Sequence, residues 1–369
     1  MEHSHRRMKK PLHGQRGAVV IWFALLLPVL VGFTALAIDL SRLGMTKAEL
    51  QNAADAAALG GARSLSNAGG SPYNWTAATS AALAVAQRNF ANADQIEDAQ
   101  IETGYWNLDD PSLGFRENSV TPVAGDVAAV RATITISRTQ NNGPLPFFFA
   151  PIFSYFDDDD DDDHANQVVQ ATATAVLPVA SKATNVFPLV INKYMYDTYW
   201  DTETNLPKND PSTGTPYVFK YGTNVKYNGQ LSGNWTAFDI DNPSDCNPCT
   251  IKHSIQDGGN STPLGIGDDI WISKLPVTSS EKQKYEDIYS YVKTNKDVAI
   301  YVVDNLVATN AGAWQPIYAI AGFHISKVVS VSGKKTIQGY FLSNYYLKTA
   351  TPGSATVAFG AYTPARLVQ

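Results

Sequence analysis

An uncharged apolar run near the start of the sequence places the strongest constraint on this chain. Residues 17–38 contain no Asp, Glu, Lys or Arg. At about 1.5 Å per helical residue they reach roughly 33 Å, enough to cross a hydrocarbon core of about 30 Å. Pro28 lies mid-span, where membrane helices tolerate a kink. The run therefore predicts a transmembrane helix bounded by Gly17 and Ile38.

Charge is distributed unevenly about this run. Residues 1–16 carry five basic residues against one acidic residue, a net +4, whereas the whole 369-residue chain has a net charge of −6. Lys and Arg hold their flank of a span in the cytoplasm. We therefore expect a single-pass protein of the bacterial inner membrane, with a cytoplasmic basic tip at 1–16 and a periplasmic or extracellular bulk. Because that bulk has a net charge of −10, no nucleic-acid partner is expected.

A cleaved secretory signal is the main competitor to a retained span. Ala35-Leu36-Ala37 has the small-x-small form that signal peptidase accepts, which makes Ala37 a candidate processing residue. The apolar run is longer than the usual core of such signals, about 7–15 residues. Leucines also continue at helical spacing beyond the run. Both observations favour one helix that runs from the membrane into water.

Small residues dominate the continuation of this predicted helix, AELQNAADAAALGGARSL at 48–65, where Gly60-Gly61 is the first strong stop signal. Such residues leave little side-chain bulk, so another element can approach the helix backbone closely. Packing on the chain's own domain and packing against other subunits are equally favoured interpretations. The candidate stem-packing residues are Ala53, Ala54, Ala57, Gly60 and Gly61.

Residues 15–65 resemble the N-terminal region of the TadE/TadG-like proteins of Flp (tight adherence) pilus assembly. The resemblance is carried by Arg-Gly-Ala at 16–18, a mid-span Leu-Pro, an Asp just after the span and Leu-Gln-Asn-Ala-Ala-Asp-Ala-Ala-Ala at 50–58. It implies a non-enzymatic minor pilin-like subunit or periplasmic adaptor, with the inner membrane and other assembly subunits as partners. Pilin-type processing after Gly17 is normally followed by Glu at the fifth mature position. Trp22 stands there, which argues against a polymerising major pilin.

The segment 39–179 is expected to form the helical stem and a small pilin-like α+β domain. Residues 73–94 space Ala and Val on one helical face, which predicts a second amphipathic helix. The apolar PFFFAPIF, 146–153, is interpreted as a short helix or strand that covers a sheet. Alternating runs of Val, Ile and Thr predict three strands. They are 100–106, 126–139 and 166–179.

Seven consecutive aspartates, 157–163, form the most conspicuous low-complexity stretch. Their mutual repulsion predicts an exposed loop. Calcium takes about six to eight oxygen ligands, but calcium loops interleave Gly and backbone carbonyls, which this stretch lacks. A solvated acidic loop is therefore favoured, and no cofactor is expected. The calcium alternative would use Asp157, Asp159, Asp161 and Asp163.

Composition changes near residue 180, where Tyr becomes frequent and turn residues separate alternating runs. Residues 180–369 are therefore expected to form a β-rich barrel or sandwich domain. Only 279–295, which opens with a Ser cap and Glu281, is predicted to be helical. The expected strands are 185–192, 215–222, 268–275, 297–307, 316–331 and 335–347.

Cys246 and Cys249 are the only cysteines in the chain. An exported domain folds in an oxidising compartment, so a local disulfide between them is the favoured interpretation. A redox pair would need a helix N-terminus to lower a thiol pKa, and the sequence after Pro248 is interpreted as β-type. A zinc site would need four ligands, and His253 adds only one to the two thiols.

No nucleophile motif, phosphate loop or zinc motif occurs in the sequence, so no catalytic residue is assigned. The carboxylate pairs Asp239-Asp241 and Asp268-Asp269 are typical of turns, and His324 is interpreted as a strand residue. The alternative to pilus assembly is a membrane-anchored adhesin or carbohydrate-binding module with a glycan ligand. Its candidate aromatic face, which core packing explains equally well, comprises Tyr199, Trp200, Trp235, Trp271 and Trp314.

Overall fold

The structure is a computed structural model, and the chain divides into two compact units. The first unit comprises residues 1–50, 90–95 and 135–171, and the second comprises 51–89, 96–134 and 172–369. The described residues are 18–66, 73–145, 168–201, 203–204, 206–222, 225–238, 248–306, 309–331, 334–354 and 359–368.

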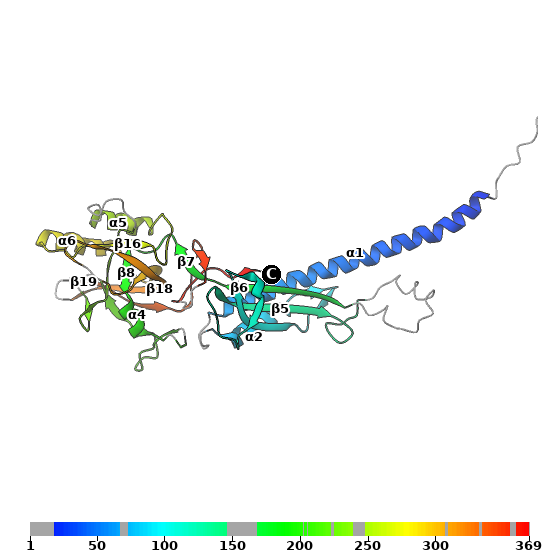
Figure 1. The fold of residues 1–369 in the computed structure, drawn as a ribbon, viewed down its shortest axis with the longest axis horizontal. Coiled ribbons are helices and arrows are strands. Elements are labelled where there is room, and N and C mark those ends of the chain that lie inside the picture. Colours follow the sequence, from blue (N-terminus) through cyan, green and yellow to red (C-terminus); the bar gives the residue numbers. More distant parts are fainter. Residues whose placement is uncertain are drawn as a thin grey trace, which may run out of the picture. The chain divides into compact units, whose positions relative to one another are not determined.

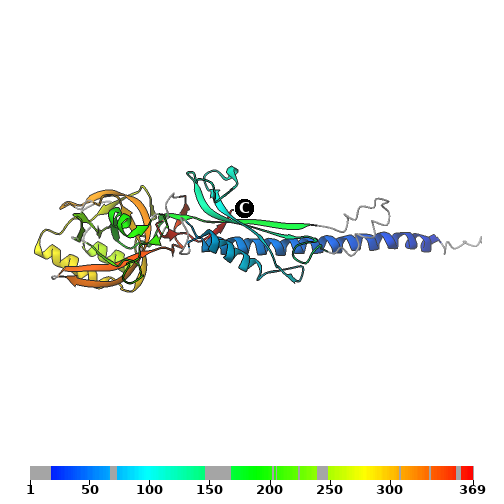
Figure 2. The ribbon, with the colours of Figure 1, turned by 90° about the horizontal axis from the view of Figure 1, so that it is seen from below.

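One helix, α1 (Ala18–Ser64), belongs to the first unit up to Leu50 and to the second from Gln51. Figure 2 shows it as a single unbroken helix. At about 1.5 Å per residue, its 47 residues reach roughly 70 Å. The predicted continuity beyond Ile38 is confirmed. The helix also passes Gly60-Gly61, because the glycines lie where close packing compensates for their low helix propensity.

A small hairpin accompanies α1 in the first unit. Its strands are β1 (Phe90–Ala91) and β2 (Asp94–Gln95), paired antiparallel. The two turn residues Asn92 and Ala93 have φ angles of 53° and 68°, the left-handed conformation that a two-residue type I′ turn requires. The prediction of one helix over 73–94 is therefore wrong at its C-terminal end, where the chain forms this hairpin.

Helix α2 (Trp75–Ala86) covers a five-stranded sheet, most of which belongs to the second unit. The side chain of Asn74 accepts a hydrogen bond from Ala77 N at 2.9 Å and so caps the helix. The sheet has the order β23-β6-β5-β3-β4, and a one-turn 3₁₀ helix (Pro111–Leu113) precedes β4. Its strands are β3 (Gln100–Asn107), β4 (Phe115–Glu117), β5 (Asp126–Ile136), β6 (Val169–Leu177) and β23 (Arg366–Leu367).

Two further sheets form the rest of the second unit. A seven-stranded sheet has the order β11-β19-β18-β17-β8-β14, with β16 paired to β18. Its strands are β8 (Leu189–Asn192), β11 (Phe219–Tyr221), β14 (Gly233–Trp235), β16 (Asp269–Ile272), β17 (Lys296–Val303), β18 (Ala313–Val331) and β19 (Lys334–Leu342).

A five-stranded sheet of short strands has the order β15-β7-β22-β20, with β21 paired to β7. Its strands are β7 (Val179–Ala183), β15 (Leu264–Gly265), β20 (Tyr345–Tyr346), β21 (Thr351–Gly353) and β22 (Ala361–Tyr362). Four more short strands form two separate pairs, namely β9 (Trp200–Asp201) with β10 (Leu206–Pro207), and β12 (Lys226–Tyr227) with β13 (Gln230–Leu231).

The central strands of the seven-stranded sheet are buried on both faces. Side chains alternate across a strand, so Val298, Ile300 and Val302 of β17 enter one core cluster, whereas Ala299 and Tyr301 enter the other. The first cluster also takes side chains from three helices, and the second takes side chains from β7, β15 and β22. The result is a layered sandwich, with helices over one face and a second sheet over the other.

The expected α+β class is confirmed, but the barrel option is wrong. Among the described residues no sheet closes, because the seven-stranded sheet ends in the edge strands β11 and β14. Two of the three helices on this sheet were also not predicted. The predicted one is α6 (Ser279–Ile288), followed by a 3₁₀ turn (Tyr289–Tyr291); the other two are α4 (Lys193–Tyr199) and α5 (Pro248–Asp257), and Figure 1 shows all three.

The cap of α6 lies one residue before the predicted Ser. Thr278 Oγ1 accepts a hydrogen bond from Glu281 N at 3.2 Å, and Glu281 Oε2 accepts one from Thr278 N at 3.1 Å. This reciprocal pair is a capping box, which satisfies two backbone donors that the first helical turn would leave without partners.

Candidate membrane anchor and packing face

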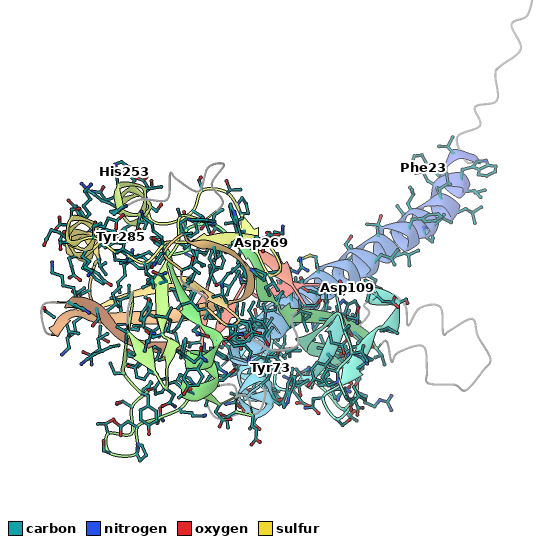
Figure 3. The ribbon with its side chains drawn as sticks, turned by 60° about the vertical axis from the view of Figure 1, so that its left-hand side comes forward. Phe23, Tyr73, Asp109, His253, Asp269 and Tyr285 are labelled. Carbon is teal, nitrogen blue, oxygen red and sulfur yellow. The ribbon has the colours of Figure 1, made fainter. Side chains whose placement is uncertain are left out.

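The first half of α1 presents apolar side chains in every direction. Each residue from Val19 to Val31 is exposed, and the exposed fractions of Phe23 and Leu30 are 67% and 63%. Figure 3 shows Phe23 projecting outward from the helix. Burying one such side chain gains roughly 1.5–3 kcal/mol. Leaving the whole segment in water would therefore cost more than the stability of a typical domain, about 5–15 kcal/mol.

Within the described part of the chain, α1 is the helix whose length and composition suffice to cross a membrane. It lies near the start of the sequence and is consistent with a single-pass membrane anchor. The first buried side chains of α1 lie near the predicted end of the span. Ala35 is 3% exposed and Asp39 is 4% exposed. Ile38 lies between them in sequence and is 49% exposed. One face of α1 is therefore covered here, while another keeps an open apolar surface.

A polar link joins α1 to the β1–β2 hairpin just beyond this point. Asn92 Oδ1 accepts hydrogen bonds from Arg42 Nε at 3.0 Å and from Arg42 Nη2 at 2.7 Å. Asn92 N donates a hydrogen bond to Glu49 Oε2 at 2.7 Å. Two side chains two helical turns apart therefore hold one turn residue. Sequence reasoning missed this link, because Asn-Ala is a weaker hairpin signal than Asn-Gly.

A groove of about 640 Å³ runs along the same stretch of α1 in the first unit. Residues at helical spacing on one face of α1 line most of it, from Thr34 through Ile38 and Met45 to Glu49. Asn92 and Ala93 of the hairpin complete the lining. The groove thus begins within the predicted span and ends at the Arg42–Asn92–Glu49 link.

The small residues of the stem pack inside the chain's own second unit. Ala53, Ala54 and Ala57 are fully buried. A Cβ atom on Gly60 would lie 2.8 Å from Val85 Cγ2 of α2. A Cβ atom on Gly61 would lie 2.9 Å from both Ala82 Cβ of α2 and Val130 Cγ1 of β5. The structure thus places α2 and β5 against the face that the sequence had left open to the domain or to other subunits.

The predicted disulfide is not supported. Cys249 lies exposed in the first turn of α5, no cysteine pair occurs among the described residues, and Cys246 lies outside them. The interpretation of the sequence after Pro248 as β-type is also wrong. A helix begins at Pro248 because proline is favoured at the first helical position, where its missing N–H costs nothing.

Other predicted site residues fall outside the described part of the chain. Ala37, the second candidate processing residue, is described and lies exposed within α1. No group of three or more His, Cys, Asp or Glu residues that could hold a metal ion occurs among the described residues. The predicted residues that lie outside the described part of the chain are Gly17, Asp157, Asp159, Asp161, Asp163, Asp239 and Asp241, together with the segment 146–153.

The proposed aromatic face divides between the core and the surface. Trp200 is 1% exposed and Trp235 is fully buried, and both belong to the core cluster that the helices cover. Tyr199 is half-buried and stacks on Phe219, with ring centroids 4.7 Å apart. The remaining two, Trp271 and Trp314, face each other across β16 and β18. Trp271 is half-buried against the same core cluster, whereas Trp314 is 40% exposed.

Among the described residues, His324 and Asp268 each contact a neighbouring ionisable side chain. His324 lies in β18, as predicted, with Nδ1 2.6 Å from Asp297 Oδ1. Asp268 Oδ2 accepts hydrogen bonds from Gly265 N at 2.9 Å and from Lys182 Nζ at 3.2 Å. The first of these is the local turn geometry that the sequence predicted for the Asp268-Asp269 pair. Figure 3 marks Asp269, on the same strand as Trp271.

Glu281 shows a large electrostatic shift at the start of α6. Its hydrogen bond from Lys274 Nζ, 2.7 Å long, and those from the backbone N–H groups of Thr278 and Val277 stabilise the charged carboxylate. Together they lower the pKa of Glu281 from 4.5 to about 2. The shift belongs to the cap of α6 and so has a structural cause.

Two protein-family models match segments in the N-terminal half of the chain. Residues 17–64, which coincide with α1, match the model of the Flp pilus-assembly TadE/G-like family (Tad). Residues 60–175, from the end of α1 into β6, match the model of the Tad-like Flp pilus-assembly family (Tad_C). No curated protein and no solved structure matches the chain. Over residues 17–175 the chain is therefore similar to the Tad (TadE/G-like) and Tad_C families of Flp pilus-assembly proteins.

Proposed function

We propose that the chain is a non-enzymatic component of a Tad/Flp-type pilus-assembly machinery, acting as a minor pilin-like subunit or a periplasmic adaptor. The family matches over 17–175 support the machinery. The bare apolar half of α1 supports attachment to the bacterial inner membrane as a single pass. The basic residues at 1–16 support a cytoplasmic N-terminal side, with the rest of the chain periplasmic or extracellular.

One observation carries this proposal: the anchor and the stem are the same helix. Residues 19–31 of α1 are exposed and apolar, whereas Ala53, Ala54 and Ala57 of α1 are fully buried against their own unit. Because α2 and β5 already occupy the small-residue face, we assign the exposed apolar half of α1 as the surface for other assembly subunits. We therefore infer that the chain acts by positioning. One helix holds an exported domain to the membrane and presents its membrane-embedded surface to partners.

The topology can be tested with the chain's own cysteine. Cys249 is exposed, so a Cys246→Ser variant leaves a single reporter thiol. We expect a membrane-impermeant maleimide to label Cys249 in intact spheroplasts. The control is His5→Cys in a chain with both native cysteines replaced, which should be labelled only after lysis. Labelling of Cys249 only after lysis would overturn the proposed orientation.

The assembly role can be tested in a bacterium that carries the chain. Replacing residues 1–38 by an efficiently cleaved signal peptide would export the same domains without an anchor. We expect this version to accumulate in the periplasm and to leave a deletion strain without surface pili, whereas the full chain restores them. Full piliation by the unanchored version would refute a role that depends on α1.

An adhesin is the second candidate function, and the exposed Trp314 beside the half-buried Trp271 is the observation that favours it. Their ring centroids lie 5.5 Å apart, and sugar rings stack on exposed aromatic faces of this kind. Saturable glycan binding by the full chain, lost on Trp314→Ala and kept on Tyr318→Ala, would support the adhesin. Tyr318 is a fair control because it is equally exposed, 40%, on the same strand.

A further inference from the structure

A cleft of about 800 Å³ lies within the second unit, between one end of the sheet that carries β23 and strands of the other two large sheets. Its volume falls in the range of ordinary ligand sites, roughly 300–1,000 Å³. From the first sheet, Asp109, which follows β3, and Arg366 of β23 line the cleft. From the other side, Ile266, Tyr318 and Phe359 line it.

The two charged side chains of this cleft lack ionic partners. Among the described residues, neither Asp109 nor Arg366 forms an ion pair, and both are exposed. The sheet order β23-β6-β5-β3 puts two strands between the strands that carry them. Neighbouring strands are about 4.8 Å apart, so β23 and β3 are roughly 14 Å apart. An ion pair needs about 4 Å, and the opposite charges therefore stand in one cleft without neutralising each other.

The loop that carries Asp109 is held by buried contacts. Asn107 is 2% exposed, and its Oδ1 accepts hydrogen bonds from Asp109 N at 3.0 Å and from Asp110 N at 2.7 Å. Gly125 lies against the same loop, where a Cβ atom would be 2.8 Å from Asp109 Oδ2. Ser354 Oγ donates to Asp109 Oδ2 at 3.5 Å, a long hydrogen bond. The carboxylate is thus positioned before a ligand arrives, which reduces the cost of ordering it on binding.

An open apolar surface lies in the same cleft. Ile266 is 43% exposed and Tyr318 is 40% exposed. Phe359 packs edge-to-face on Tyr318, with ring centroids 5.6 Å apart. Covering such side chains removes apolar surface from water, which favours binding. A ligand that fits this cleft therefore carries apolar groups as well as both charges.

We propose that this cleft binds an extended peptide segment of a partner protein, with an acidic side chain against Arg366 and a basic side chain against Asp109. An extended chain advances about 3.3–3.4 Å per residue, so a span of roughly 14 Å places the two charged positions about four residues apart. Apolar side chains between them cover Ile266 and Tyr318. The inference adds a partner surface to the proposed assembly role but does not depend on the membrane anchor.

Charge complementarity selects a peptide. The guanidinium of Arg366 matches a carboxylate in a bidentate geometry, and the carboxylate of Asp109 accepts hydrogen bonds from an ammonium or a guanidinium group. A glycan of acidic sugars carries only negative charge, so it would satisfy Arg366 and be repelled by Asp109. A peptide supplies both signs of charge and apolar groups on one backbone at the required spacing.

Peptide selection with the full chain in nanodiscs tests the proposal. A display library of random heptapeptides is depleted on empty nanodiscs and then panned on nanodiscs that hold the protein. We expect the enriched sequences to contain one acidic and one basic residue three to five positions apart, with apolar residues between them. No enrichment over the depleted library, or enriched sequences without that charge pair, would overturn the proposal.

The affinity of one enriched peptide, synthesised with a fluorescent label, is then measured by anisotropy. A peptide of the same composition with its two charges adjacent should bind about five-fold more weakly. Tri-galacturonate at the concentration of the peptide should not displace it. Displacement by this sugar would assign the cleft to acidic glycans, and equal binding of the two peptides would show that the charge spacing has no role; either result contradicts the proposal.

Charge reversal assigns the contacts. Arg366→Glu should select peptides with two basic residues, and Asp109→Lys should select peptides with two acidic residues, an inversion that a purely structural role would not produce. The milder variants Arg366→Gln and Asp109→Asn should each weaken the enriched peptide about five-fold. The matched controls Arg88→Gln and Asp110→Asn change exposed residues of the same types outside the cleft lining and should bind as wild type. Equal losses in variants and controls would refute the assignment.

The cleft and the anchor fail in different ways. A chain that floats with lipid vesicles but selects no peptide refutes the cleft alone. A chain that selects the expected peptides but does not float supports the cleft and refutes the proposed membrane attachment.

Discussion

Two glycines of α1 show how the environment decides what one residue contributes. A Cβ atom on Gly44 would have no atom of the described residues within 4 Å, whereas one on Gly61 would lie 2.9 Å from Val130 Cγ1 and 3.0 Å from Ala78 O. A side chain at Gly44 therefore changes only helix propensity, in which glycine is the poorer residue by about 1 kcal/mol. A side chain at Gly61 must displace α2 or β5.

We predict that Gly61→Leu lowers the free energy of unfolding by about 1–3 kcal/mol through overpacking, while Gly44→Leu leaves it unchanged or raises it by up to about 1 kcal/mol. Thermal unfolding of the full chain in detergent, followed by near-ultraviolet circular dichroism, measures both. Equal effects at the two positions would contradict the packing of α1 on its own unit.

The capping residue of α6 gives a prediction in pH. The folded pKa of Glu281 is about 2 against an ordinary value of 4.5. A lowered carboxyl pKa stabilises the fold fully above the unfolded value, and this contribution disappears as the pH falls from about 4.5 to about 2. Glu281→Gln should therefore melt below wild type at pH 6, and the two should converge near pH 2. The control Lys282→Gln changes an exposed neighbour. A gap independent of pH would refute the assignment.

Among the elements, those with a strong internal period were predictable from the sequence. The uncharged run 17–38 and the leucines beyond it indicate α1, and alternation over 100–106 and 126–139 indicates β3 and β5. Helix α5 was missed because its sequence is polar and short, and α4 because four residues of KYMYDTY are aromatic or β-branched. Both helices form against the seven-stranded sheet, a tertiary context that no local pattern contains.

The candidate site likewise contains residues that the sequence could bring together and residues that it could not. Ala53, Ala57 and Gly61 could be assigned to a packing face because small residues recur at helical spacing on one helix. Arg42, Asn92 and Glu49 could not be brought together, because the first two lie 50 positions apart and meet only when the hairpin folds onto α1. A link of this kind depends on the left-handed φ at Asn92 and Ala93.

The hairpin prediction follows from that link. Asn92→Ala removes the acceptor for Arg42 and places a residue less tolerant of the left-handed region at a φ of 53°. Deuterium exchange in residues 90–95 should rise at least several-fold, as expected for a loss of about 1–2 kcal/mol. Ala93→Gly, where φ is 68°, should instead slow exchange or leave it unchanged. Unchanged exchange in Asn92→Ala would mean that the link does not hold the hairpin.

For the molecule as a whole, each unit depends on segments that are distant in sequence. Strand β23 pairs with β6 in the register Arg366↔Val176 and Leu367↔Ala175. The end of the chain is thus part of the sheet on which the stem packs. Tyr346 OH donates to Arg63 O at 3.0 Å and lies 2.7 Å from Ser66 Oγ. The part of the chain beyond the family-matched residues 17–175 is therefore tied to the end of α1 through Tyr346.

The C-terminal ties give a prediction of their own. Tyr346→Phe removes the hydroxyl that contacts Arg63 O and Ser66 Oγ. Net hydrogen-bond contributions of about 0.5–1.5 kcal/mol each predict a modest loss of stability. Limited proteolysis should then cut faster near residues 63–66. Tyr340→Phe, on β19 and stacked on His324, is the matched control and should leave that cleavage unchanged.

The central claim is that the apolar half of α1 is embedded in lipid while the helix remains joined to its exported domains. The most direct measurement is flotation of alkali-washed membranes on a density gradient, with the polypeptide detected at full length by antibodies to both ends. The account predicts that the intact chain floats with the lipid fraction after the carbonate wash. Recovery of the intact chain in the soluble fraction at the bottom of the gradient would contradict it.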